Sequence, residues 1–368
     1  MQSSASITAL SVSFPSVVRT NDYWRRKYPE VMAKADEKTL ARVFSATNST
    51  AATSHFDDAM MPYVSDPFRG TVERRYLGPG ESSVGVEVKA VKDVLAARGI
   101  SKDEIDAMIV TSFVPDTVIL GDAAHLAKAM DMRCPAWNLE AACTGGVPAL
   151  QSAAALVRAG EYRRVLVVVA CMYSRIVDEK DSLSWFMGDG SGAFIVEPAD
   201  EGTGILATKL VSTADTCDVF PVDLIKDERG EPRMWLHVGP RAAQPRETSG
   251  PLLHDCVDGV LAKAGLHKDD IKCFVFNTPV AWFHDFGARA LGVDPERTLT
   301  TYPSYANIGP ALLAANLYHA ARAGKIKKGD LVLCFGIGFT SHAAAMIMRW
   351  GDVALGPLPP ASSELVRD

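Results

Sequence analysis

One cysteine in this 368-residue chain stands in a setting that suits a nucleophile. Cys143 lies in the segment Leu139-Glu-Ala-Ala-Cys-Thr-Gly-Gly146, just before a predicted helix that begins near Pro148. The N-terminus of a helix offers free N–H groups and the positive end of the helix dipole, which lower the pKa of a thiol and make it a better nucleophile. The small neighbours leave room for a substrate carbonyl. The alternative is a small, buried structural cysteine, the commonest role of a free Cys.

Two asparagines and one glycine loop are further candidates. Asn307 precedes a second predicted helix, where its amide can donate to a developing oxyanion or simply cap the helix. Asn277 follows the predicted strand 274–276, at the end of a strand where α/β folds place functional groups, or it is a turn residue in Asn-Thr-Pro. The loop Gly336-Ile-Gly-Phe-Thr340, which contains Gly338, can offer a backbone N–H to an oxyanion or form an ordinary tight turn.

Other residue types give weaker signals. His284 is the only histidine near a suspected site, and the eight His have no spacing typical of a metal centre, so no metal site is predicted. The run Gly188-Asp-Gly-Ser-Gly192 lacks the spacing of a dinucleotide or P-loop motif. We expect it to form a turn that leads into a strand over 193–196. A basic group at Arg158, Arg163 and Arg164 can contact a phosphopantetheine carrier or be a solvated helix end.

An internal repeat relates the main candidates to one another. Residues 94–105 (VLAARGISKDEI) match residues 260–271 (VLAKAGLHKDDI) at seven of twelve positions, and an apolar run follows each block. Farther along, the stretch that begins at Cys143 corresponds to the stretch that begins at Asn307. These two residues therefore occupy equivalent places in two copies of one motif.

The predicted domains follow from this repeat. The first half, residues 1–200, carries Cys143, and the second half, residues 201–368, carries Asn277 and Asn307. Residues from about 21 to 70 have no counterpart in the second half and are predicted to be an insertion.

Each copy is predicted to contain helix, strand, loop, helix and strand, in that order. Gly99, Gly160, Gly265 and Gly324 are predicted helix ends, because Gly accepts the left-handed conformation there. The strand runs are short and nearly all apolar, which is typical of strands covered by helices on both faces. The helix over 148–157 is apolar almost all round and is predicted to be buried. We therefore expect an α/β fold with five layers, α/β/α/β/α.

Two segments outside the repeat have less regular patterns. Within the insertion, residues 24–42 have helical character and residues 45–54 form a Ser/Thr/Asn-rich stretch that is expected to be a loop. The tail after Gly356 is rich in Pro and Ser and is expected to be loosely held.

Composition excludes several classes of protein. With 38 Lys and Arg against 44 Asp and Glu, the net charge of −6 argues against a nucleic-acid or anionic-membrane partner. No apolar run reaches the ~18 residues of a spanning helix, and the N-terminal residues lack the pattern of a secretory signal. The seven scattered Cys contain no C-x-x-C pair and fit a reducing compartment. We therefore expect a cytoplasmic globular protein.

The motifs together resemble the thiolase superfamily and, within it, ketoacyl-ACP synthase III. The resemblance covers residues from about 72 to 350 and rests on Glu140-Ala-Ala-Cys-Thr-Gly-Gly146, Phe186-Met-Gly-Asp-Gly-Ser-Gly-Ala193, Asn307-Ile-Gly-Pro310 and Phe335-Gly-Ile-Gly-Phe339. It implies a thiolase-like fold of five layers, a homodimer, and a Cys143 that takes an acyl group from acyl-CoA or acyl-ACP without a tightly bound cofactor. It also implies an oxyanion hole formed by the backbone N–H groups of Cys143 and Gly338.

The chain departs from that family at one position. The family's triad is Cys, His and Asn, and counting back from Asn307 without a gap places Asn277, or Thr278 after a shift by one, where the His is expected. An amide can donate a hydrogen bond but cannot act as a base at neutral pH. Whether His284 or another histidine enters the site is left open.

The function expected from these residues is acyl transfer. Cys143 would form an acyl-thioester and pass the acyl group to a small-molecule acceptor, by Claisen-type condensation or by ester or amide formation, in fatty-acid-like or polyketide metabolism. One alternative is a non-catalytic partner subunit of an active homologue, which loss of the His would permit. Another is a thioesterase-like hydrolase on the same fold.

Overall fold

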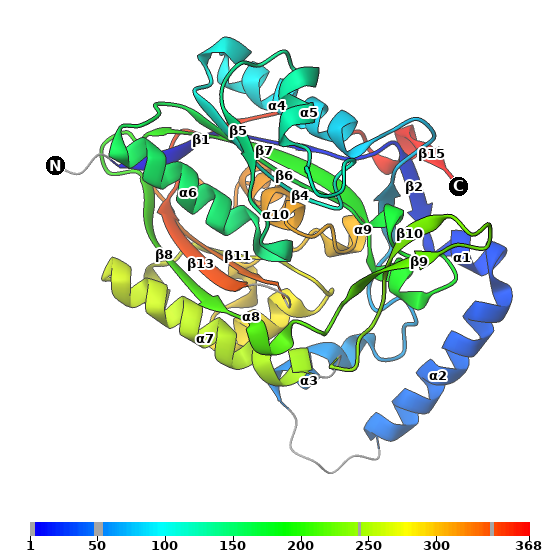
Figure 1. Ribbon diagram of the computed structural model, residues 1–368. Coiled ribbons are helices and arrows are strands. Elements are labelled where there is room, and N and C mark those ends of the chain that lie inside the picture. Colours follow the sequence, from blue (N-terminus) through cyan, green and yellow to red (C-terminus); the bar gives the residue numbers. More distant parts are fainter. Residues whose placement is uncertain (1–3, 48–53, 242–243, 339–341) are drawn as a thin grey trace.

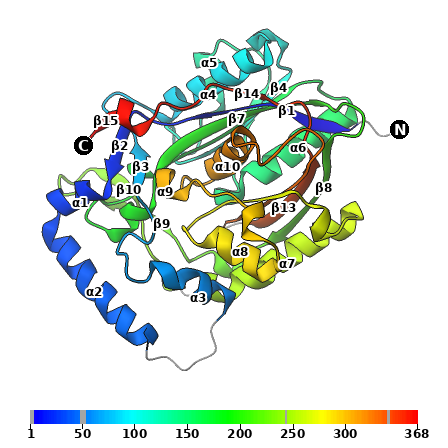
Figure 2. The ribbon, with the colours of Figure 1, turned by 180° about the vertical axis from the view of Figure 1, so that it is seen from behind.

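Two β-sheets enclose a pair of buried helices in this computed structural model (Figures 1 and 2). The structure describes residues 4–47, 54–241, 244–338 and 342–368. The first sheet has the order β14-β1-β7-β6-β4-β5. Its strands are β1 (Ala5–Ser13), β4 (Ala107–Phe113), β5 (Ala136–Asn138), β6 (Val165–Met172), β7 (Asp189–Pro198) and β14 (Ala354–Leu355).

The second sheet has the order β11-β12-β13-β8. It consists of β8 (Gly204–Ser212), β11 (Cys273–Phe276), β12 (Leu331–Ile337) and β13 (His342–Arg349). The two helices between the sheets are α6 (Gly146–Ala159) and α10 (Ala311–Arg322). The outer helices are α4 (Ser83–Arg98) and α5 (Ala123–Ala129) on the first sheet, and α7 (Gln244–Ala264) and α8 (Phe283–Leu291) on the second. This arrangement confirms the predicted α/β fold with five layers.

The apolar pattern of the sequence explains the central layer. Most side chains of α6 and α10 are buried, and they join the inner faces of both sheets in one apolar core. Two of the predicted helix ends, Gly99 and Gly160, have φ values of 71° and 74° and close α4 and α6. An Ala at either position would have to adopt a strained backbone, so these glycines fix where each helix ends.

The glycine run 188–192 is not the turn that we expected. Asp189 begins strand β7, and Gly190 and Gly192 lie inside that strand, in a buried part of the first sheet. A Cβ atom on Gly192 would lie only 2.4 Å from the Cβ of Ala314 on α10. The glycines are therefore needed because a central helix packs directly against the strand.

The insertion forms helices, and the second of them extends farther than we expected. Helix α1 (Asn21–Lys27) is followed by α2 (Pro29–Thr47), which Pro29 begins because proline suits the first helical position. The helix continues past the predicted start of the loop at Ser45, and residues 48–53 of that loop lie outside the described residues. Helix α3 (His55–Met60) follows.

The C-terminal tail is tied down rather than loosely held. Its last strand, β15 (Val366–Arg367), pairs with β2 (Val17–Thr20), which in turn pairs with β3 (Glu73–Tyr76). Asp368 accepts a hydrogen bond from Arg19 at 3.1 Å. Backbone pairing at this position could not be foreseen from the composition of the tail.

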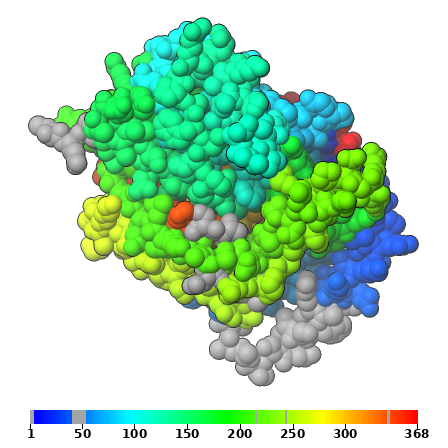
Figure 3. All heavy atoms as spheres, in the orientation of Figure 1, coloured from blue at the N-terminus to red at the C-terminus, as the bar shows by residue number. Residues whose placement is uncertain are grey.

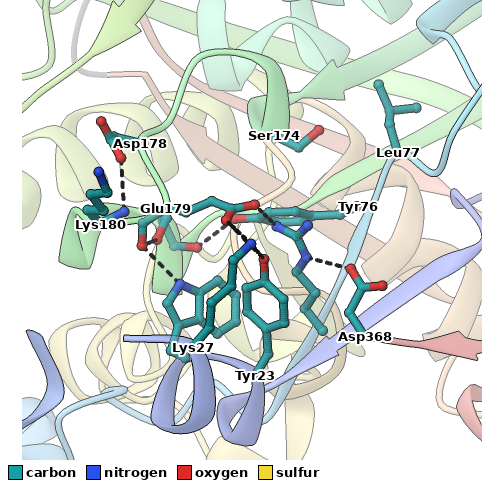
Figure 4. Close-up of polar contacts among 12 residues, drawn as sticks. Tyr23, Lys27, Tyr76, Leu77, Ser174, Asp178, Glu179, Lys180 and Asp368 are labelled. Carbon is teal, nitrogen blue, oxygen red and sulfur yellow. Dashed lines mark hydrogen bonds and ion pairs between the residues drawn. The ribbon is translucent and has the colours of Figure 1, made fainter. Parts of the chain in front are cut away.

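One carboxylate holds the insertion against the first half of the chain. Glu179 accepts hydrogen bonds from Arg19 at 2.5 Å, Tyr23 at 2.9 Å, Lys27 at 2.9 Å and Tyr28 at 2.8 Å (Figure 4). Helix α1 is therefore fastened to the loop that precedes η5 (Ser182–Phe186), a short 3₁₀ helix.

Glu179 should make the protein sensitive to acid. Partial burial tends to raise the pKa of its carboxyl, but the bonds from Lys27, Arg19 and the two tyrosines outweigh this and lower the pKa to about 2. A pKa that is lower in the folded state contributes stability above the unfolded value, and this is lost as the pH falls toward the folded value. We predict that the free energy of unfolding decreases from about pH 5 toward pH 2. In Glu179→Gln this free energy should decrease less steeply over the same pH range. Urea unfolding at a series of pH values measures the free energy of unfolding of both proteins.

The control is Glu228→Gln, because Glu228 is exposed and its one ion-pair partner in the described part of the chain is Lys180, at 3.3 Å. Equal slopes for wild type and Glu179→Gln would contradict the prediction.

Candidate active site

A mostly apolar cavity of about 250 Å³ lies between the two halves of the chain. Its polar lining residues among those described are Cys143, Tyr173, Ser249 and Asn307, and no charged side chain or histidine lines it in the described part of the chain. The other lining residues are Phe56, Phe113, Ala142, Leu183, Phe186, Met187, Phe220, Leu236, Pro245, Pro279, Val280, Phe283 and Ile337.

The insertion and a surface hairpin complete the wall of this cavity. Phe56 comes from α3, and Leu236 ends β10 (Pro232–Leu236), which pairs with β9 (Val222–Lys226). In the space-filling view the hairpin, in yellow-green, lies on the surface beside the N-terminal helices in blue (Figure 3). Segments that have no counterpart in the repeat therefore shape the cavity.

Cys143 lies where the sequence placed it, in a short 3₁₀ turn (Ala142–Thr144) directly before α6. The turn begins with a strained residue, because Ala142 has a φ of 48°. The Ala142 N–H donates to the Glu140 carboxylate at 2.5 Å, which holds this conformation. On the other side, Thr144 donates to the carbonyl oxygen of His342 at 3.1 Å. The nucleophile loop is thus fixed at both ends.

The electrostatics of the thiol differ from the prediction. We expected the helix terminus to lower the pKa of Cys143, but burial raises it above the usual value. The sulfur lies 3.3 Å from the phenol oxygen of Tyr173, a hydrogen bond in which either group can donate. This bond lowers the thiol pKa but does not offset burial. At neutral pH the resting sulfur is therefore a thiol, and it needs a proton acceptor when it attacks.

Asn307 faces the same cavity from the second half. Its backbone N–H donates to the Phe186 carbonyl oxygen, and its own carbonyl oxygen accepts from Gly188, both at 2.9 Å. Its side-chain oxygen accepts from the Gly309 N–H at 2.9 Å. It does not cap α10, which begins four residues later at Ala311. Among the described residues no acceptor takes the side-chain N–H₂, so this group can donate to a ligand.

The backbone before Asn307 repeats the strain seen before Cys143. Ala306 has a φ of 57° and a ψ of −156°, a region that non-glycine residues almost never occupy. In both copies of the motif an alanine with positive φ directly precedes the functional side chain. The equivalence inferred from the repeat thus extends to the local backbone.

Comparisons with known proteins agree with this geometry. The sequence model described as 3-oxoacyl-[acyl-carrier-protein (ACP)] synthase III matches residues 137–214, and its C-terminal counterpart matches residues 261–350. The chain is 29% identical over 325 residues to β-ketoacyl-[acyl-carrier-protein] synthase III of Rhizobium rhizogenes, covering 85% of this chain and 99% of that protein. It is 30% identical over 293 residues to the synthase of Agrobacterium fabrum, covering 77% and 89%.

The chain belongs to the β-ketoacyl-ACP synthase III family. The solved synthase III of Thermus thermophilus superimposes with a TM-score of 0.76 at 26% identity, covering 94% of this chain and 99% of that one. OleA from Xanthomonas campestris shares the fold, with a TM-score of 0.75 at 17% identity, covering 95% and 100%. The chain is thus a member of a family of acyl-transferring, condensing enzymes.

Asn277 contacts the backbone of two loops rather than the cavity. It is buried at the end of β11, and its side-chain N–H₂ donates to the carbonyl oxygen of Cys143 and, at 3.4 Å, to that of Gly309. Asn277 does not line the cavity. The residue predicted as a hydrogen-bond donor to substrate therefore binds the backbone of the nucleophile instead.

No histidine among the described residues replaces it. His284 lies on α8, where its Nδ1 contacts the Ala281 carbonyl oxygen at 2.9 Å, and it does not line the cavity. His125 lies 3.0 Å from the Thr117 hydroxyl on the surface, and His342 lies in β13.

The predicted oxyanion loop differs in detail. Gly336 and Ile337 are still part of β12, and residues 339–341 lie outside the described residues. Gly338 lies close to the nucleophile, because a Cβ atom on it would be 3.4 Å from the Cys143 nitrogen. Its N–H donates to the His342 carbonyl oxygen at 2.8 Å. To donate to a substrate oxyanion, as the resemblance implied, this N–H would have to give up that bond.

The basic group after α6 is remote from the cavity. Helix α6 has 14 residues, and at 1.5 Å per residue it separates Arg158 from Cys143 by about 20 Å. Arg164 forms ion pairs with Glu197 at 2.6 Å and Glu104 at 2.8 Å. None of these three arginines lines the cavity.

Sequence reasoning missed two polar residues of the cavity. Tyr173 directly follows the apolar strand β6, and nothing in that pattern distinguishes it from a packing residue. Ser249 lies on α7, completely buried, and its hydroxyl has no partner among the described residues. A buried unpaired hydroxyl in a cavity is a group that a ligand can satisfy.

We predict that Asn277→Ala lowers the free energy of unfolding by about 1–3 kcal/mol, because two buried carbonyl groups lose their donor. Asn277→Asp should cost more, since its carboxylate would face the carbonyl oxygens of Cys143 and Gly309. Denaturant unfolding of the three proteins measures both effects. An Asp variant as stable as wild type would show that the Asn277 amide does not hydrogen-bond to these two carbonyl oxygens.

Proposed function

We propose that the protein accepts an apolar acyl group from acyl-CoA or acyl-ACP onto Cys143 and transfers it to a second substrate. The observation that carries this proposal is the position of Cys143 in the wall of an apolar cavity that Asn307 also lines. The family to which the chain belongs forms and transfers acyl groups. The phosphopantetheine arm of either donor would bring its thioester into this cavity.

The lining of the cavity supports an apolar acyl group. Aromatic and aliphatic side chains make up most of the wall, and burying hydrocarbon against them is favourable by about 25 cal/mol per Å². The few polar groups, from Asn307, Ser249 and Tyr173, can orient the carbonyl end.

The choice of acceptor remains between a carbon nucleophile and an oxygen or nitrogen nucleophile. No cation among the described residues lines the cavity to hold a malonyl carboxylate, and no imidazole assists decarboxylation. Both observations support an acceptor that is neutral and carries a hydroxyl or an amine.

Intact-mass spectrometry tests the acylation step. Wild-type protein incubated with acyl-CoA donors of increasing chain length should gain the mass of one acyl group, and Cys143→Ala should gain none. Cys256→Ala is the matched control, because Cys256 is a buried thiol on α7 that does not line the cavity. This variant should acylate like wild type.

Absence of an adduct with every acyl-CoA and acyl-ACP donor would overturn the proposal. The alternative inferred from the sequence, a non-catalytic partner of an active homologue, would then apply. Rapid release of free acid without an acceptor would instead indicate a hydrolase.

We further propose that the protein is a homodimer, as the resemblance implied. Strand β5 is an open edge of the first sheet, and the loop beside it exposes Val118, Ile119 and Leu120, with Ile119 97% exposed. This loop is held in place: Asn138 of β5 donates to the Leu120 carbonyl oxygen at 2.7 Å. A fixed apolar surface next to an open strand edge is typical of an interface.

The oligomeric state can be tested with one substitution. Ile119→Asp should shift the protein from a dimer toward the 39.6 kDa monomer in light scattering after size exclusion, because the carboxylate would be buried in the interface. Leu224→Asp changes an equally apolar residue that is 75% exposed on β9 and should leave the dimer intact. A wild type that is monomeric, or an Ile119→Asp variant that remains dimeric, would contradict this proposal.

No helix in the described ranges is both long and apolar enough to cross a bilayer. Cytoplasmic location and a role in fatty-acid-like or polyketide metabolism stay predictions.

A further inference from the structure

The sulfur of Cys143 has one side-chain partner among the described residues, the phenol of Tyr173. Tyr173 begins a short 3₁₀ turn (Tyr173–Arg175) that follows β6, and it is 4% exposed. Its ring packs edge-on against Phe113, which also lines the cavity, with 5.5 Å between ring centroids. The phenol oxygen lies 3.3 Å from the sulfur. The contact is therefore built into the wall of the cavity and does not depend on a mobile surface side chain.

This contact is notable because the group expected at the sulfur is elsewhere. The Asn277 amide is occupied by the carbonyl oxygens of Cys143 and Gly309. Asn307 faces the cavity with an amide, which donates hydrogen bonds but does not exchange protons at neutral pH. Of the polar side chains in the lining, the Tyr173 phenol is the one in hydrogen-bond contact with the sulfur that can both give and take a proton.

The surroundings keep this pair uncharged at rest. Burial raises the pKa of both Cys143 and Tyr173. The titratable groups that act on the pair are Glu140 before the nucleophile turn and Cys171 on β6, and each disfavours a negative charge there. The phenol bond and the backbone N–H of Cys143 itself are the interactions that favour a thiolate. A neutral phenol held against a neutral thiol is suited to move a proton as the sulfur reacts.

We propose that Tyr173 is a catalytic residue that relays the proton of the Cys143 thiol to the departing thiolate during acylation. This inference rests on the proposed acyl transfer. The bond from sulfur to the acyl carbon forms, and the thioester bond of the donor breaks. The thiol proton passes to the phenol oxygen while the phenol proton passes to the leaving sulfur, so Tyr173 ends the step as it began and no charge is left in the cavity.

The same relay can run in the second half-reaction. When a hydroxyl or amine attacks the acyl-thioester, its proton passes to the phenol oxygen and the phenol proton returns to the sulfur of Cys143. The new acyl bond forms as the carbon–sulfur bond breaks. An acceptor that carries a proton on its attacking atom therefore fits Tyr173, whereas a decarboxylating malonyl unit brings no such proton.

The test compares wild type with Tyr173→Phe, which keeps the ring and removes the hydroxyl. With acyl-CoA as donor, acylation of Cys143 should slow by about 100-fold or more, the usual contribution of general acid–base catalysis. Alkylation of Cys143 by iodoacetamide should also have its pH midpoint moved upward, because the thiolate loses a hydrogen bond. A role in packing alone would not move this midpoint.

Tyr318→Phe is the matched control. Tyr318 is a buried tyrosine on α10 whose hydroxyl donates to the Gly356 and Pro357 carbonyl oxygens, away from the cavity. It should keep both the acylation rate and the alkylation midpoint. Should Tyr173→Phe fail to fold, the second measurement is the rate at which wild type is acylated in D₂O. If a proton moves in the rate-determining step, acylation should be slower in D₂O than in H₂O.

Two negative results have different meanings. Acylation of wild type together with unchanged rates and midpoint in Tyr173→Phe, or no slowing in D₂O, would overturn the relay and leave the proposed function standing. If wild type takes no acyl group from any donor, the proposed function fails and the relay with it.

Discussion

One side-chain amide holds together the two loops on which the site depends. Asn277 donates to the carbonyl oxygen of Cys143, before α6, and to that of Gly309, before α10. These loops are equivalent parts of the two copies of the repeat, and no covalent connection holds them together. The amide is buried between the two loops. Its hydrogen bonds to both of them, together with helix packing, therefore set the distance between the nucleophile and Asn307. Precise positioning of this kind is what acyl transfer needs.

The backbone is strained in both of the loops that Asn277 joins. Ala142 and Ala306 have positive φ values, which cost of order 1–3 kcal/mol each and which only surrounding contacts can maintain. The bond from Ala142 to Glu140 supports the first, and the bonds between Asn307 and the residues before β7 support the second. The duplicated fold thus supplies two strained turns that face one cavity.

The spacing of apolar residues and the internal sequence repeat were enough to predict the fold, because both reflect which residues are buried locally. A strand was predicted at residues 274–276, and β11 covers 273–276. The five layers follow from the apolar helices. The glycine run of β7 was assigned wrongly because the reason for it, the approach of Ala314, comes from a helix over 100 residues away. Tyr173 was missed for the same reason, because the sulfur that it contacts is distant in sequence. The strand before it has the apolar pattern of any core strand.

The absence of a cation from the described part of the cavity limits the chemistry that it can support. In a medium of low dielectric constant an unbalanced negative charge is costly. An imidazole near the sulfur would be able to become positive and balance a thiolate. Here the phenol can only share its proton, and the Asn307 amide can only donate a hydrogen bond. Such a site favours a path in which the proton moves together with the heavy atoms, so that charge on the sulfur never fully develops, and this in turn favours acceptors that bring a proton of their own.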